Sequence, residues 1–201
     1  MENGDHSHGK YIVVEDHLFL ALCDTPSPQG IMAVVRDVSV SIEDALRAVP
    51  KLVVIADGLQ DPGNMGALVR VADAVGAGAF VSLSNSVDIY NSKVIRATMG
   101  SVFHLPIVKN ATSEQVLNIL LASNYNIVAT DARGQTNHFE YNYSFPLAVV
   151  FGNEGSGLSP IWQSIATMVR IPMLGKAESL NVATAGAAML YEIFRQNLRN
   201  L

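Results

Sequence analysis

The stretch "LAVVFGNEGSGLSP" at residues 147–160 decides the fold class of this chain. Its first six residues are apolar or small and predict a buried strand. Its glycines at 152, 155 and 157 predict a turn at the end of that strand, and Ser159 with Pro160 then marks the start of a helix. A strand that leads through a turn into a helix is the repeating unit of an α/β protein.

The same alternation of strands and helices continues on both sides of this stretch. Apolar runs of four to six residues separated by helices are typical of a parallel sheet that is covered on both faces. We therefore expect an α/β fold with a mostly parallel sheet and helices on both faces. Strands are predicted at 31–36, 51–58, 79–83, 103–108, 126–131, 147–152 and 168–172, and helices at 41–49, 64–76, 91–100, 112–123, after Ser159 and from about Ser179.

Length and composition narrow the class of protein. The 201 residues allow one domain and a short appendage, and the 49% hydrophobic content leans towards a buried oligomeric surface. No apolar run is long enough to span a bilayer, and the single Cys23 fits a reducing cytoplasm. Because the net charge is −5, any surface that binds nucleic acid must be local. Residues 1–10 are polar, and we expect them to be disordered.

Three loops that follow predicted strands look specialised. In 59–70, Asn64 is expected to cap a helix, and Arg70 lies about 120° from it around the helix axis. In 149–160, the glycines match neither a dinucleotide fingerprint nor a Walker loop, and Glu154 favours a hydroxyl, an amine or a cation over a phosphate. The third loop, 170–186, brings polar side chains to the start of a helix.

Several chemistries find no support in the sequence. There is no G-x-S-x-G nucleophile elbow, no Cys/His cluster at metal-ligand spacing and no motif of paired carboxylates. No metal is therefore expected. We interpret His104, within a predicted strand, and His138, within a predicted loop, as core or surface residues. A nicotinamide-dependent enzyme would share the sheet but lacks the glycine fingerprint.

The three loops together resemble the SpoU (TrmH-type) branch of the SPOUT superfamily, whose members are RNA ribose 2′-O-methyltransferases. The motifs stand in order as "DPGNMGALVRVADAVG" from 61, "VVFGNEGSGLS" from 149 and "IPMLGKAESLNVATAGAAMLYE" from 171. The intervening "NSKVIRATMGSVFHLPI" is also similar to the family. The resemblance covers about residues 51–195, and three ordered motifs make it specific.

The resemblance implies a C-terminal trefoil knot that binds S-adenosylmethionine, a homodimer, and methyl transfer to a ribose 2′-OH in structured rRNA or tRNA. The small residues 183–188 would then lie on a helix that is tucked through the knot beside the cofactor. The positions that match catalytic residues of the family are Asn64, Arg70, Glu154, Ser179 and Asn181. The positions that match its cofactor pocket are Thr130, Gly152, Ile171, Met173 and Leu180.

Arg70 corresponds to a residue that is thought to activate the ribose hydroxyl in the family. An arginine side chain rarely gives up its proton. We therefore expect Arg70 to hold the flanking phosphate or to stabilise the developing alkoxide.

Two departures from the family pattern keep an alternative open. The family commonly has a serine where this chain has Ala183, and relatives that modify rRNA carry a full N-terminal RNA-binding domain. Here 1–50 resembles only the end of that domain and its connection, whereas 51–201 resembles the catalytic domain. The alternative is an RNA-binding knotted dimer with weak or no catalytic activity.

Overall fold

The computed structural model describes residues 12–25 and 27–198, and the chain divides into two compact units, one up to Asp37 and one from Val38. The first unit contains helix α1 (Asp16–Leu22). The strand predicted at 31–36 is wrong: these residues form no regular structure, and Ile31 is 86% exposed. The apolar pattern is present, but no strand among the described residues pairs with it through hydrogen bonds. The prediction for residues 1–10 lies outside the described residues.

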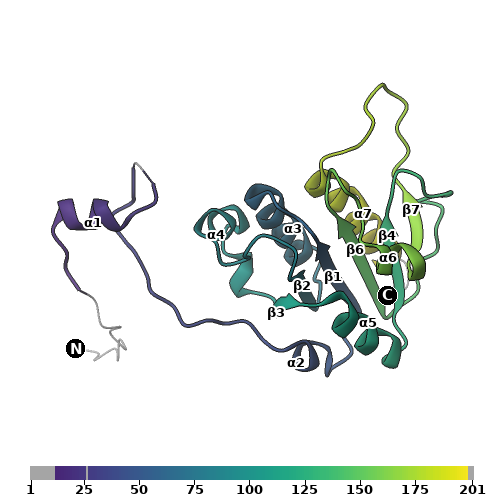
Figure 1. Ribbon diagram of the computed structural model, residues 1–201, viewed down its shortest axis with the longest axis horizontal. Helices are drawn as coiled ribbons and strands as arrows, with labels where there is room; N and C mark the ends of the chain where they lie inside the picture. Colours follow the sequence, from purple (N-terminus) through teal and green to yellow (C-terminus); the bar gives the residue numbers. More distant parts are fainter. Residues whose placement is uncertain (1–11, 26, 199–201) are drawn as a thin grey trace, which may run out of the picture. The chain divides into compact units, whose positions relative to one another are not determined.

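The second unit is built on a seven-stranded sheet in which every neighbouring pair runs parallel. The order across the sheet is β3-β2-β1-β6-β4-β7-β5, with β1 and β6 at its centre (Figure 1). The predicted parallel sheet is thus confirmed. The strands are β1 (Leu52–Asp57), β2 (Ala79–Leu83), β3 (Ile107–Ala111), β4 (Asn126–Thr130), β5 (Thr136–Asn137), β6 (Leu147–Gly152) and β7 (Thr167–Arg170).

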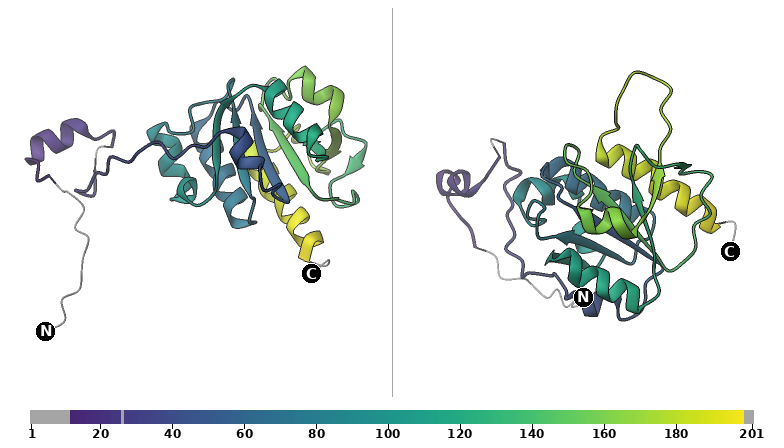
Figure 2. Two further views of the ribbon diagram at one scale, coloured as in Figure 1. Left: turned by 90° about the horizontal axis from the view of Figure 1, so that it is seen from below. Right: turned by 45° about the vertical axis from the view of Figure 1, so that its right-hand side comes forward.

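Helices cover both faces of the sheet, as Figures 1 and 2 show. Helices α3, α4 and α7 pack on one face, and α2, α5 and α6 pack on the other. Alternate residues of β1 belong to different cores, because successive side chains of a strand point to opposite faces. The helices are α2 (Ile42–Leu46), α3 (Pro62–Ala74), α4 (Ser92–Thr98), α5 (Ser113–Ala122), α6 (Pro160–Ile165) and α7 (Val182–Leu198), with the 3-10 helix η1 (Ser101–Phe103) after α4.

Helix boundaries follow the capping residues in the sequence, with two corrections. The helix predicted at 112–123 is confirmed as α5, which begins with a capping box of Thr112 and Gln115. Asn64 does not cap α3. The cap is Asp61, whose side chain accepts a hydrogen bond from the backbone N–H of Asn64 at 2.8 Å. Helix α7 begins at Val182, three residues later than expected, since Asn181 accepts from the backbone N–H groups of Ala183 and Thr184.

His104 is not in a strand. It ends η1, and its Nδ1 lies 2.8 Å from a carboxylate oxygen of Asp73 on α3. The strand predicted there begins only at Ile107. The two-residue strand β5 was not predicted, because it is too short to give an alternating pattern.

The small residues at the start of α7 have a packing reason. A Cβ atom at Gly186 would lie 2.4 Å from Cδ1 of Leu68 on α3, so the two helices are in close contact there. In the part of the chain that the structure describes, no helix is both long and apolar enough to cross a membrane.

Candidate functional site

A pocket of about 450 Å³ lies at the carboxyl ends of the central strands. It is bounded by the segments that follow β4, β6 and β7 and by the start of α7. Ligands of open α/β sheets bind at this edge, and the volume falls in the range of ligand pockets, about 300–1,000 Å³. The sequence-predicted residues among its lining are Thr130, Gly152, Glu154, Ile171, Met173, Ser179 and Leu180.

The glycine-rich turn after β6 is a closed structural unit. Asn153 and Gly157 exchange two backbone hydrogen bonds, and Gly157 has a positive φ of 73°. A Cβ atom at Gly152 would lie 2.7–2.8 Å from backbone atoms of Gly157 and Leu158. Gly152 and Gly157 are therefore required by the turn itself, whereas the sequence suggested only that the glycines admit a ligand.

Three predicted catalytic residues are joined by side-chain hydrogen bonds. Asn181 Nδ2 donates to Asn64 Oδ1 at 2.8 Å, and Asn64 Nδ2 donates to Glu154 Oε1. These residues come from the start of α7, the first turn of α3 and the turn after β6. Because each side chain has a partner, the carboxylate of Glu154 is held in place at the pocket.

Ala183 does not disturb this arrangement. Its backbone N–H donates to Asn181 Oδ1 at 3.0 Å, a bond that does not depend on the side chain at that position. A serine in its place would add a hydroxyl group but would leave the cap unchanged.

Arg70 differs from the other predicted catalytic residues, because it neither lines the pocket nor bonds to any of them. Its side chain is exposed and bonds to none of the residues that the structure describes. Leu68, which packs against α7, is two residues away, so Arg70 points about 200° from it around α3. Arg70 shares a face instead with Gly66, where α4 packs. It therefore points away from the pocket of its own chain.

The charges around the pocket leave one acidic group without a cation. Arg133 donates to both carboxylate oxygens of Asp131, at 3.0 and 2.7 Å, and this holds the pKa of Asp131 below its ordinary value. Glu154 has no such partner among the described residues. The lining therefore favours a ligand with positive charge.

Asp57 was missed by the sequence analysis. It is buried at the end of β1 and accepts hydrogen bonds from Asn85 Nδ2 at 2.9 Å and from the backbone N–H of Ser159 at 2.6 Å. Asn153 in turn donates to the backbone oxygen of Gly58 at 2.8 Å. These bonds fix the loop after β1 to the glycine-rich turn. An acidic residue at the end of an otherwise apolar strand was the available signal.

The fold and the pocket define an α/β protein with a pocket at the carboxyl edge of a parallel sheet. The chain belongs to the SpoU rRNA Methylase family, whose model matches residues 51–191. This confirms the resemblance inferred from the three motifs.

Two relatives show the extent of the likeness. The chain is 36% identical over 151 residues to a 23S rRNA (uridine(2479)-2′-O)-methyltransferase of Streptomyces viridochromogenes, covering 72% of this chain and 53% of that protein. It is 33% identical over 184 residues to the 23S rRNA (guanosine(2553)-2′-O)-methyltransferase RlmP of Bacillus subtilis strain 168, covering 91% of this chain and 71% of that one. The chain thus spans about half to three quarters of the length of these relatives.

Solved structures agree with the fold. An rRNA methyltransferase from Sinorhizobium meliloti superposes with a TM-score of 0.83 at 31% identity, over 92% of this chain and 70% of that one. The SpoU methyltransferase AviRb from Streptomyces viridochromogenes, solved in complex with AdoMet, gives 0.69 at 33% identity, over 82% and 60%.

Proposed function

We propose that this protein transfers a methyl group from S-adenosylmethionine to a ribose 2′-OH of structured RNA, with rRNA as the favoured substrate. The observation that carries the proposal is the hydrogen-bonded set of Asn181, Asn64 and Glu154 beside the pocket. Membership of the family and the activities named for the two relatives support it. A reducing cytoplasm, expected from the single Cys23, is the matching compartment.

The pocket fits this cofactor by its chemistry. S-adenosylmethionine, which supplies a methyl group on a positively charged sulfonium, carries a net positive charge. Glu154 provides an acidic group without a cationic partner among the described residues, and the backbone at Gly152 lies in the lining. Ile171, Met173 and Leu180 supply an apolar part of the wall. The residues proposed to hold the cofactor are Thr130, Gly152, Ile171, Met173 and Leu180.

The remaining predicted residues act on the substrate in this proposal. Asn64 and Asn181 fix the orientation of Glu154, and the exposed Ser179 at the pocket contributes a hydroxyl group for the ribose. Positioning the ribose oxygen in line with the methyl group supplies a large share of such rate enhancements. Arg70 holds the adjacent phosphate or stabilises negative charge on the ribose oxygen.

We further propose that the chain is threaded into the trefoil knot of the family. Strand β7 pairs with β4 on one side and β5 on the other, although β4 and β5 follow each other in the chain. A Cβ atom at Gly134, in the loop between them, would lie 2.8 Å from the carbonyl carbon of Val169 on β7. These contacts support a later strand lying within an earlier loop, and an experimental chain trace from 130 to 190 tests the threading.

The segment between β5 and β6 lies against α7. Gln196 on α7 donates to the backbone oxygen of Tyr141 at 3.1 Å and accepts from the backbone N–H of Tyr143 at 3.3 Å. The chain between β4 and β6 thus contacts β7 before β5 and α7 after β5, and both contacts support the proposed threading. We also propose that residues 1–50 form an N-terminal segment and that residues 51–201 form the catalytic domain.

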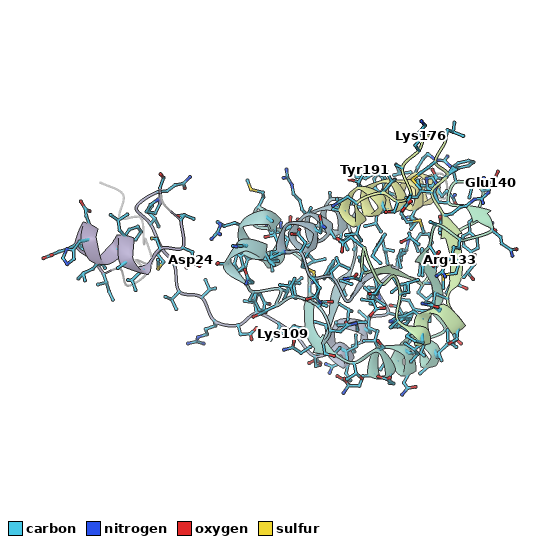
Figure 3. The ribbon with its side chains drawn as sticks, turned by 45° about the horizontal axis from the view of Figure 1, so that its top comes forward. Asp24, Lys109, Arg133, Glu140, Lys176 and Tyr191 are labelled. Atoms are coloured by element: carbon cyan, nitrogen blue, oxygen red, sulfur yellow. The ribbon has the colours of Figure 1, made fainter. Side chains whose placement is uncertain are left out.

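A homodimer gives Arg70 a site on which to act. Because Arg70 points away from the pocket of its own chain, the proposed role requires that it reach the pocket of a second copy. Helix α7 offers a surface for such contact: Thr184 is exposed, and Tyr191 is 51% exposed on its outer side (Figure 3). Small side chains along that side permit close packing of two copies.

The test combines ligand binding with methyl transfer. Calorimetric titration with S-adenosylhomocysteine, with NAD as the control ligand, is expected to show one micromolar site per chain. With radiolabelled S-adenosylmethionine and protein-free 23S rRNA, methyl groups are expected at ribose 2′ oxygens. Arg70→Ala is expected to abolish transfer and to leave cofactor binding nearly unchanged. Failure of the wild-type protein to bind S-adenosylhomocysteine and to methylate 23S rRNA, alone or within ribosomal subunits, would contradict the proposal.

A further inference from the structure

Cationic side chains without partners gather on one helix of an otherwise acidic protein. The chain has a net charge of −5, yet no Asp or Glu occurs between Asp88 and Glu114. Helix α4 lies within this stretch and exposes Lys93 and Arg96, which bond through their side chains to none of the described residues. We call the exposed side chains of Lys93, Arg96, Met99 and Phe103 the α4 face.

Three other cations of the second unit are already neutralised by a carboxylate. Arg47 pairs with Asp44, Arg133 pairs with Asp131 and Arg195 pairs with Glu192. Lys93 and Arg96 are three residues apart on α4, so their side chains are neighbours about one turn apart. Two adjacent cations without counter-charges form a local positive surface that the net charge conceals.

The α4 face also exposes large apolar groups beside its cations. Met99 is 73% exposed and adopts a left-handed conformation with φ of 52°, which is uncommon for a residue other than glycine. Phe103 in η1 is 50% exposed. Helix α4 and η1 are in contact, so the cations and the exposed aromatic ring lie on neighbouring elements. Such a combination matches single-stranded or looped RNA, where phosphates meet the charges and an unstacked base meets the ring.

The place of α4 in the fold links this face to the site. Helix α4 packs directly on α3, because a Cβ atom at Gly66 would lie 2.4 Å from the Cβ atom of Ala97. Arg70 is one turn beyond Gly66 on the same face of α3, and thus borders α4. Figure 1 shows α3 and α4 side by side. An RNA strand engaged by Arg70 would continue over the α4 face.

We propose that the α4 face binds RNA phosphates flanking the target nucleotide, with Lys93 and Arg96 as the phosphate contacts. The inference rests on the proposed function. It names the local surface with which this acidic protein would bind RNA. Lys93 and Arg96 contribute affinity for RNA and take no part in the chemical step.

The experiment compares two double variants with the same net charge of −7, two below the wild-type −5. Lys93→Gln/Arg96→Gln removes the proposed contacts. Arg47→Gln/Lys51→Gln is the control, since both residues lie just before β1, at the edge of the sheet opposite the pocket. Binding of protein-free 23S rRNA is measured from 50 to 400 mM salt, together with kcat and KM for methyl transfer.

Loss of two phosphate contacts is expected to reduce the slope of log Kd against log salt by about 1.4–1.8, which corresponds to about 25- to 60-fold weaker binding at 0.1 M salt. The KM for RNA should rise while kcat stays unchanged, and the control should keep the wild-type slope. Equal losses in both variants, an unchanged slope in the α4 variant, or dissociation of the dimer by that variant would overturn the proposal. Because wild-type methyl transfer is measured in the same series, failure of the proposed function is recognised separately.

Discussion

Gly152→Ala tests whether the pocket depends on the closed turn after β6. The new Cβ atom would lie 2.7 Å from the carbonyl carbon of Gly157, and 2.8 Å from its oxygen and from the nitrogen of Leu158. All three are backbone atoms, so no side chain can rotate away to relieve the contact. Gly152 does not have a positive φ, and the cost is therefore steric.

The magnitude follows from two contributions. Overpacking of a tight site by one methyl group costs about 1–3 kcal/mol. Moving the turn also weakens the paired hydrogen bonds between Asn153 and Gly157, each worth about 0.5–1.5 kcal/mol. The two contributions overlap, because movement that relieves the contact strains the bonds. We expect the free energy of unfolding to fall by about 2–4 kcal/mol, in the range of severe single substitutions.

Gly155→Ala is the matched control within the same turn. A Cβ atom there would meet only Asn153 Oδ1 at 3.5 Å, an ordinary contact, and Gly155 has no positive φ. Its effect should stay within about 1 kcal/mol. Urea unfolding measures stability, and titration with S-adenosylhomocysteine measures the pocket. If Gly152→Ala were as stable as the wild type, or if both variants lost the same stability, the argument for a rigid turn would be refuted.

Two further predictions concern buried and paired carboxylates. Asp57→Asn replaces one of two accepting oxygens by an N–H donor that must face either Asn85 Nδ2 or the N–H of Ser159. The free energy of unfolding, measured in urea, should therefore fall by about 1–3 kcal/mol. An unchanged urea midpoint would contradict the bonding described. Hydrogen bonding from Arg195 lowers the pKa of Glu192 from 4.5 to about 2, so this carboxylate contributes stability that is present above pH 4.5 and is lost as the pH falls towards 2. Glu192→Gln should flatten the stability profile in that window, and an equally steep profile in the variant would rule out this contribution.

The sequence predicts well what depends on local patterns. The central strands appear where apolar runs of four to six residues stand, and α5 falls within the helix predicted at 112–123. The strand predicted at 31–36 fails because a strand needs a neighbour, which a hydropathy pattern does not supply. The sequence predicts Asn64 as the cap of α3, whereas Asp61, three residues earlier, fulfils that role. Two polar residues of similar capping preference cannot be separated by sequence alone.

The position of the pocket could be predicted because parallel strands place their following loops at one edge of the sheet. All five residues expected to hold the cofactor line it: Thr130, Gly152, Ile171, Met173 and Leu180. The bonds among Asn181, Asn64 and Glu154 could not be predicted, since their distances depend on how α3, α7 and the turn after β6 pack together. Asp57 was overlooked because its role is to hold the turn and not to line the pocket.

Arg70 shows most clearly where sequence reasoning ends. Helical periodicity places it about 120° from Asn64, but only the packing of α3 between α7 and α4 decides that it points away from the pocket. A residue that faces away from the site of its own chain can serve that reaction only from a second copy. If Arg70 acts in methyl transfer, mixing inactive Arg70→Ala chains with inactive Asn181→Ala chains should restore activity in hybrid dimers, because one pocket then receives intact residues from both chains. Absence of any complementation, with hybrid dimers demonstrated by mass, would remove Arg70 from the partner's site.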